Sequence, residues 1–476
     1  MKTLLIICLF FIFNITHAQL PFEPLKKITN TEFQLAPKLS YQILFQEGDA
    51  VSTNDGKVAP AKGHHDYNCF IPNEDNPNKG TLFVSHECND SSTILGDGGG
   101  ATLITLSKSD RQWNVVLKEN IGFSNVGGTY NNCSGVLTSN NKILSAEEFP
   151  PNSNKNLFKK GKGFRDTSDF LQHPRWQNMG WMVEVDVKTK KATQKLFSLG
   201  RYSHEGAIIM PDNKTMFLTD DHSPSVFFKF IADSPNEFDK GQLYAYRQET
   251  DRTSGKWIPL PMEIDSLLIA RDVALRLGAT FFLRMEWLTY VDGKIYITET
   301  GTADFDYSKK NCFNGNPAEH LSKIMTINNN KETIDFPFGA VLMFDPNSNT
   351  IQPLLKGGES ITSPKKYFYN PDGITFCRHK NKTYLVINED NIQKLGKDIP
   401  YVKKLQNTNK IWWLDLSIKK PQIDDLQLFL LVPEGAESTG GYFTPDYKSY
   451  FVNIQHPNSN NIIPWNKSST IVISGW

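Results

Sequence analysis

Short runs of alternating hydrophobic and polar residues make up most of the chain. They are rich in Val, Ile, Phe, Tyr and Thr, and turns rich in Gly, Asn, Asp and Pro separate them. This is the pattern of short β-strands joined by tight turns. One stretch, IDSLLIARDVALRLGA (264–279), has helical periodicity instead. The pattern therefore predicts an all-β protein with few helices.

A hairpin motif recurs along the chain, with a turn, a strand and then a polar residue that could bind a metal ion. The copies are NKGTLFVSHE, NNKILSAEE, DNKTMFLTDD, DGKIYITET, NKTYLVINED and DYKSYFVNIQH. Sheet units that repeat without a βαβ rhythm are typical of radial β-architectures. We therefore predict a six-bladed β-propeller with long insertions between and within its blades, as a single domain over residues 19–476.

A second polar residue begins the strand that precedes most of these turns. The segments are NCSGVL, SHEGAII, RMEWLTY, NPDGITF and AESTGGYF, with Cys133, Glu205, Glu286, Asp372 and Glu437. A hairpin brings the start of one strand and the end of the next to the same edge of the sheet. Because propeller blades point corresponding edges at one axis, these side chains should converge with the acidic residues that end the second strands.

Converging carboxylates repel one another and lose hydration unless cations compensate them. Carboxylate oxygens suit calcium, whereas the thiolate of Cys133 would favour a transition metal such as iron, zinc or manganese. Alternatives remain open for each residue type. Any single acidic residue could cap a turn, and Cys133 could be a buried core thiol or a disulfide partner. His204 and His456 could be interior histidines or ligands.

The first residues, MKTLLIICLFFIFNITHA, combine Lys2, an apolar run and a small-residue cleavage site. We predict an export signal over residues 1–18, and therefore a periplasmic or extracellular protein. In that environment Cys69 and Cys88, or Cys312 and Cys377, could form disulfides, although spacing does not settle the pairing. No later apolar run has the ~20 residues of a membrane span.

The charge balance gives no support for binding to nucleic acid, and the missing motifs argue against a serine hydrolase, a nucleotide-binding protein and a zinc protease. The 51 Lys and Arg residues balance 51 Asp and Glu residues, so charge does not favour nucleic acid or an acidic membrane surface. The sequence has no Gly-x-Ser-x-Gly, Walker, dinucleotide or His-Glu-x-x-His motif.

A calcium-dependent lactonase or phosphotriesterase, or a calcium-binding propeller without activity, would also fit acidic residues at the axis.

Six segments of the sequence resemble the PhoX-type alkaline phosphatases, a family of secreted bacterial enzymes. These segments are NCSG, AEE, GRYSHEGA, RMEWL, NPDGITF and AESTGGYFTPDYKSYFVNIQHP. The resemblance extends from about residue 64 to residue 476, and GRYSHEGA together with NIQHP is its specific part. It implies a six-bladed propeller that acts on small phosphate monoesters, with two iron ions and three calcium ions in an axial pocket. We also expect a monomer.

The resemblance also implies roles for individual residues. Cys133 is similar to the thiolate ligand of iron, and Glu205 and Glu286 are similar to catalytic carboxylates that bind the metal ions. Arg284 matches an arginine that binds the substrate phosphate. Ser85 stands in FVSHEC where we expect an asparagine that contacts phosphate, so Ser85 is the second candidate substrate contact. The further expected metal ligands are Glu87, Glu147, Glu148, Asp372, Glu389 and Glu437.

Overall fold

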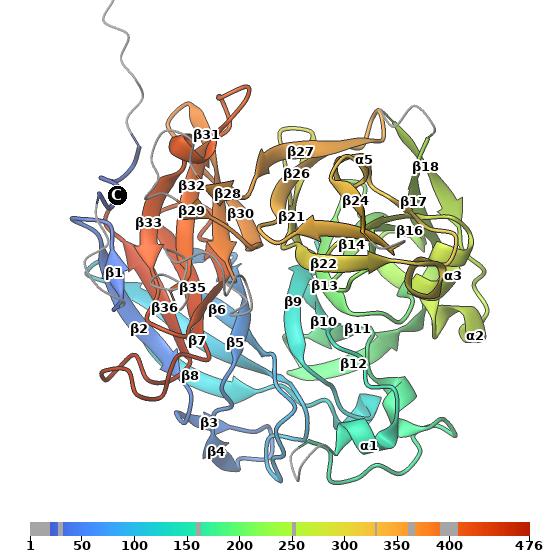
Figure 1. Ribbon diagram of the computed structural model, residues 1–476. Helices are drawn as coiled ribbons and strands as arrows, with labels where there is room; N and C mark the ends of the chain where they lie inside the picture. Colours follow the sequence, from blue (N-terminus) through green and yellow to red (C-terminus); the bar gives the residue numbers. More distant parts are fainter. Residues whose placement is uncertain are drawn as a thin grey trace, which may run out of the picture.

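The computed structural model describes residues 20–26, 32–158, 163–249, 254–328, 331–359, 367–390 and 408–476. Within these ranges strands dominate and the helices are short, which confirms the predicted all-β class (Figure 1). None of the helices described is both long and apolar enough to cross a membrane. The predicted export signal over residues 1–18 lies outside the described residues.

Among the described residues, six sheets of four or more strands form the body of the protein, and we number them as blades in chain order. Their pairings are antiparallel except in blade 1, where β3 (Ala50–Ser52) joins the edge strand in parallel. Blade 1 contains β5 (His65–Asn73), β6 (Asn76–His86), β7 (Ala101–Ser109) and β8 (Gln112–Asn120). Blade 2 contains β9 (Asn132–Leu137), β10 (Lys142–Glu147), β11 (Met182–Asp186) and β12 (Lys191–Leu196). Blade 3 contains β13 (His204–Ile209), β14 (Thr215–Asp220), β16 (Phe228–Ser234), β17 (Glu237–Gln248) and β18 (Gly255–Pro259).

The later blades repeat this order, and strands from the N-terminal part of the chain complete the last two. Blade 4 contains β20 (Met285–Val291), β21 (Lys294–Glu299), β26 (Ala340–Asp345) and β27 (Thr350–Lys356). Blade 5 contains β30 (Pro371–His379), β31 (Lys382–Glu389), β32 (Lys410–Asp415), β33 (Gln427–Leu431) and β1 (Gln34–Leu35). Blade 6 contains β34 (Glu437–Phe443), β35 (Ser449–Gln455), β36 (Ser469–Ser474) and β2 (Ser40–Gln46).

The first strands of the six blades form a closed ring. Strand β5 contacts β9, and the contacts continue through β13, β20, β30 and β34 back to β5. The pairing of β2 with β36 joins the N-terminal and C-terminal strands in one blade, where Figure 1 shows blue and red strands side by side. This ring gives the radial arrangement of a β-propeller, with the first strand of each blade at the axis.

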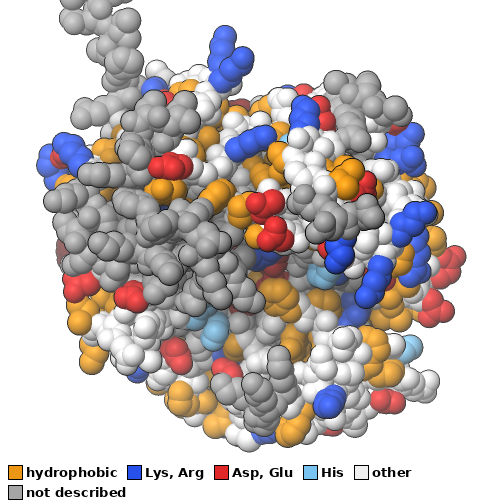
Figure 2. Space-filling view, in the orientation of Figure 1, with side chains coloured by type: hydrophobic (Ala, Val, Ile, Leu, Met, Phe, Trp, Pro, Cys, Tyr) orange, Lys and Arg blue, Asp and Glu red, His pale blue; other side chains and the backbone are white. Residues whose placement is uncertain are grey.

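Hydrophobic layers fill the space between neighbouring blades. One buried cluster extends across blades 2, 3 and 4 and includes Leu144, Met216 and Ile297. Another, between blades 5 and 6, surrounds Trp413, whose ring centroid lies 5.5 Å from that of Phe429. Alternating side chains of one strand thus contribute to the packing on both faces of a blade. On the surface, Figure 2 shows acidic and basic side chains interspersed.

The predicted insertions lie within and between blades. The helical stretch 264–279 lies between blades 3 and 4, but it forms two short helices, α2 (Ile264–Leu267) and α3 (Ala270–Arg276). The helix breaks at Ile269, where φ is −130°. Residues 300–339 form another insertion, between β21 and β26, and it includes α5 (Glu319–Ser322).

Candidate metal centre

Each inner strand carries a residue that could bind a metal ion at the same place. In blades 1 to 5 it is the second residue of the strand, and in blade 6 it is the first. In blades 1 to 5 the register shifts here, with a step of three residues on the inner strand against two on its partner. Such β-bulges redirect a side chain without ending the sheet. The six residues are Asp66, Cys133, Glu205, Glu286, Asp372 and Glu437.

The residue that directly follows the second strand of a blade reaches the same place. The side chain of Glu148 interacts with those of Glu87 and Asp221. The negative charge of Asp390 raises the pKa of Glu437. His456 Nε2 lies 3.3 Å from Glu437 Oε2. Together with the six inner-strand residues, these side chains form what we call the axial cluster. Its members from second strands are Glu87, Glu148, Asp221, Asp390 and His456.

Two groups within the axial cluster have the geometry of a metal site. Cys133, Glu148 and Glu205 each offer a ligand atom within 4.8 Å of the other two. Glu205, Glu286 and Asp372 do the same. Glu205 belongs to both groups, so one carboxylate is placed to serve two neighbouring metal ions. All of these side chains are buried.

The electrostatics of the cluster fit bound cations. Burial raises the pKa of Glu205 well above its ordinary value, and the charges of Glu286 and Asp66 raise it further. Burial and neighbouring carboxylates also raise the pKa of the Cys133 thiol. Cations would remove this repulsion and favour the charged forms. Asp372 supports this fit directly, because its Oδ1 atom is buried without a hydrogen-bond partner among the described residues.

Arg284 adds a cationic group beside the cluster. Its Nε and Nη2 atoms lie 2.7 and 3.0 Å from the two carboxylate oxygens of Asp221, and Nη2 is also 2.9 Å from Glu286 Oε1. Burial opposes ionisation of Asp221, yet Arg284 holds its pKa below the ordinary value. Nη1 of Arg284 makes no hydrogen bond within the described part of the chain, and the side chain is 19% exposed. The guanidinium is therefore held by two carboxylates with donor capacity left for an anionic ligand.

The structure does not bring Glu147 and Glu389 into the axial cluster, although the sequence predicts both as metal ligands. Glu147 accepts hydrogen bonds from Lys195 Nζ at 2.6 Å and from two backbone N–H groups. Glu389 pairs with Lys410 Nζ at 3.1 Å. Each is the last paired residue of its strand. Because successive side chains of a strand point in opposite directions, this residue points away from the axis and the next residue points toward the axis. Cations of the protein itself already compensate these two carboxylates.

Ser85 is also placed differently from its prediction as a substrate contact. Its hydroxyl accepts a hydrogen bond from Tyr67 N at 2.8 Å and donates one to the carbonyl of Cys133 at 2.7 Å. Thr219 repeats this link in blade 3, where it accepts from Gly206 N at 2.8 Å and donates to the carbonyl of Glu286. The Ser85 hydroxyl therefore joins the inner strands of blades 1 and 2, and this geometry does not support a contact with substrate.

Three members of the axial cluster, Asp66, Asp221 and Asp390, are not among the metal ligands expected from the sequence, although Asp221 and Asp390 end two copies of the recurring hairpin motif. Asp66 lies in HHDYNCF, which precedes NKGTLFVSHE as NCSGVL precedes NNKILSAEE. Extending the repeat to the first blade would have found it. Asp221 and Asp390 belong to the acidic pairs at the ends of second strands, where the sequence does not show which carboxylate faces the axis.

His204 and the five cysteines among the described residues lie in the protein interior. His204 Nε2 contacts Gly200 O at 2.8 Å, and burial lowers the pKa of the ring to about 3. This is the interior position considered from the sequence. Cys69, Cys88, Cys133, Cys312 and Cys377 are buried free thiols, so the considered disulfides do not form between them in the structure.

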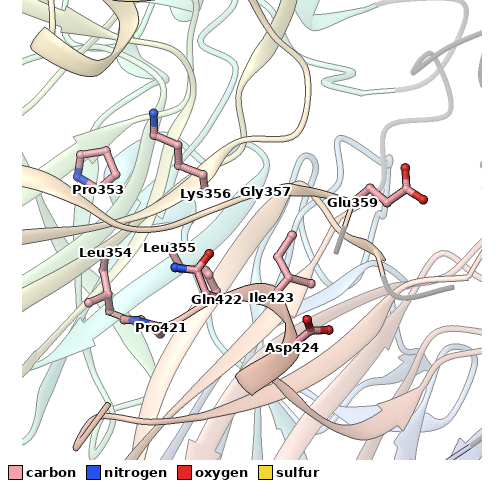
Figure 3. A pocket seen from close by; sticks show the side chains of 10 residues that line it. All are labelled: Pro353, Leu354, Leu355, Lys356, Gly357, Glu359, Pro421, Gln422, Ile423 and Asp424. Atoms are coloured by element: carbon pink, nitrogen blue, oxygen red, sulfur yellow. The ribbon is translucent and has the colours of Figure 1, made fainter. Parts of the chain in front are cut away.

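A separate hollow of about 330 Å³ lies at the surface between β27 and residues 421–424. Figure 3 shows the ends of Lys356, Glu359 and Asp424 pointing in different directions instead of toward one point. No residue of the axial cluster lines this hollow. The described residues that line it therefore form no second group of convergent polar side chains.

Known proteins match most of the propeller. A family model described as alkaline phosphatase PhoX matches residues 20–458. The structure of Pseudomonas fluorescens PhoX in complex with vanadate, a transition state analogue, is 18% identical, with a TM-score of 0.73, and the match covers 95% of this chain and 98% of that one. A sialidase mutant of Trypanosoma rangeli is 11% identical over 92% of this chain and 59% of its own, with a TM-score of 0.40. No curated protein matches the sequence.

Proposed function

This chain belongs to the alkaline phosphatase PhoX family, and we propose that it hydrolyses phosphate monoesters with metal ions held by the axial cluster. The observation that carries the proposal is the position of Glu205, within 4.8 Å of ligand atoms from two groups. Two adjacent cations are a known arrangement for the displacement of a phosphoryl group. The proposal includes export by residues 1–18 and a monomeric state.

The two groups of metal ligands differ in their donor atoms. Cys133, with Glu148 and Glu205, forms the group with a sulfur atom and suits iron. Glu205, Glu286 and Asp372 offer only oxygen and suit calcium. When bound, the metal ions compensate the charge on the phosphoryl oxygens and lower the pKa of coordinated water. We propose both metals, with two iron ions and three calcium ions as the family resemblance implies.

The residues beside the cluster hold the substrate and the ligands in place. Arg284 would bind the phosphoryl oxygens through the guanidinium that Asp221 orients from the opposite side. Thr300 Oγ1 donates to Glu286 Oε1 at 2.9 Å and fixes that carboxylate. Because these contacts exist before substrate binds, little reorganisation opposes the developing charge of the transition state.

The metal content of the purified protein, measured together with hydrolysis of a chromogenic phosphomonoester, tests the proposal. We expect iron and calcium in the active protein, and we expect a chelator to remove metal and activity together. Added iron and calcium should restore both. Calcium alone, with turnover of a lactone but no phosphomonoester, would contradict the proposal and favour the lactonase. Full metal loading without any ester hydrolysis would favour a binding protein.

Arg284→Lys is expected to weaken binding of substrate and of inorganic phosphate by about 10–100-fold. A charge-assisted hydrogen bond contributes about 1.5–3 kcal/mol, and Lys keeps the charge but loses the planar fork. The measurements are KM and the inhibition constant of phosphate. Metal content should stay unchanged, because a positive charge still faces Asp221 and Glu286. Unchanged phosphate inhibition would remove Arg284 from the substrate site.

A further inference from the structure

The indole of Trp287 contacts the carboxylate that the two metal-ligand groups share. Its Nε1–H donates to Glu205 Oε1 at 2.8 Å. Trp287 follows Glu286 on β20, whereas Glu205 lies on β13, so the hydrogen bond joins the inner strands of blades 3 and 4. An indole N–H donates and cannot accept. It therefore engages one lone pair of Glu205 and restricts rotation of the carboxylate.

Neighbouring side chains hold the indole in place. Thr298 Oγ1 donates to the backbone carbonyl of Trp287 at 3.0 Å. The ring of Tyr67, from blade 1, lies 5.6 Å from the Trp287 ring. The side chain is 6% exposed, so it has little room to change rotamer. Trp287 can thus keep Glu205 in one orientation.

A second indole–carboxylate pair in blade 5 shows what distinguishes this one. Trp412 Nε1 donates to Glu389 Oε1 at the same distance, 2.8 Å. Glu389, however, also pairs with Lys410, which compensates its charge. The hydrogen bonds that Glu205 makes with the Trp287 indole and with the Cys133 thiol bring no positive charge. A neutral donor orients the carboxylate and leaves its charge for cations.

We propose that Trp287 is a positioning residue that orients Glu205 so that this carboxylate can serve both groups of metal ligands. The inference rests on the proposed function, because it assigns a task within the same site. It assigns that task to a side chain that binds neither metal nor substrate. Groups that donate to a metal-binding carboxylate set the orientation of the ligand, and their loss lowers metal affinity.

Two replacements of Trp287 test the inference. Trp287→Phe removes the N–H group and part of the ring, whereas β-(3-benzothienyl)alanine at position 287 replaces N–H by sulfur and keeps the ring volume. We expect both to raise the free Ca²⁺ concentration needed to half-load the protein by about 10–100-fold. Elemental analysis after equilibration with buffered Ca²⁺ gives this value. We also expect kcat to fall with little change in KM, because Arg284 is untouched.

Trp412→Phe is the matched control, since it loses the same hydrogen bond and a similar buried ring outside the axial cluster. It should keep wild-type calcium loading and kcat. Equal loading of wild type and the benzothienyl protein would overturn the inference, whatever the folding of Trp287→Phe. Equal losses in the Trp287 and Trp412 variants would also overturn it, because the effect would then be general destabilisation. A wild type without bound metal and without phosphatase activity would instead overturn the proposed function.

Discussion

Glu205→Gln is expected to lower kcat for a phosphomonoester by about a thousand-fold, the largest effect that we expect from a single carboxylate. Glu205 belongs to both ligand groups, so the amide should weaken both proposed metal positions at once. A thousand-fold change corresponds to about 4 kcal/mol, which is within the several kcal/mol that metal ions contribute to charge stabilisation in the transition state. Steady-state kinetics and metal content per chain measure the effect.

Glu147→Gln is the control for this prediction. Glu147 is as deeply buried as Glu205, but its partner is Lys195 at 2.6 Å. Breaking a buried ion pair costs about 3–5 kcal/mol, so this variant should unfold at lower denaturant concentration. Its folded fraction should nevertheless keep metal and kcat. Loss of metal in Glu147→Gln but not in Glu205→Gln would contradict the assignment of the axial cluster.

Cys133→Ser is expected to remove iron and to abolish most of the activity, because a hydroxyl is a far poorer ligand for this metal than a thiolate. The fold should persist, since Ser is close in size to Cys and Cys133 forms no disulfide. Calcium should be retained at the oxygen-only group of Glu205, Glu286 and Asp372. Iron per chain, loss of thiolate-to-iron absorption and kcat are the measurements.

Cys69→Ser is the matched control for the thiol. Cys69 is a buried free cysteine of the inner strand β5, but it belongs to neither metal-ligand group. The Cys69→Ser variant should keep its iron and its phosphatase activity. Wild-type iron and activity in Cys133→Ser would remove the thiolate from the proposal, and the calcium-dependent alternatives would then gain support.

The architecture could be predicted from the sequence because its signals are local and repeated. The alternation of hydrophobic and polar residues identified the strands. The recurring hairpin with polar ends indicated six units around one axis. The repeat also identified Cys133, Glu205, Glu286, Asp372 and Glu437, because corresponding strand starts lie at corresponding places in a propeller. The break of the predicted helix at Ile269 was not visible, since short helices depend on tertiary packing more than on periodicity.

The choice between adjacent carboxylates needed the fold. A shift of one residue in a strand turns a side chain to the opposite face, so Glu148 and Asp390 face the axis while Glu147 and Glu389 pair with lysines. Those lysines, Lys195 and Lys410, lie far along the chain, and no local pattern connects them with their partners.

The contacts of Ser85 and Trp287 could not be predicted from local sequence patterns either. Ser85 links two blades, and Trp287 reaches Glu205 on another blade; both contacts form between segments that meet when the ring of inner strands closes. The residue types at the axis and their repetition are thus local properties of the chain. Their orientation depends on strand register, on β-bulges and on neighbouring blades, which exist after the chain has folded.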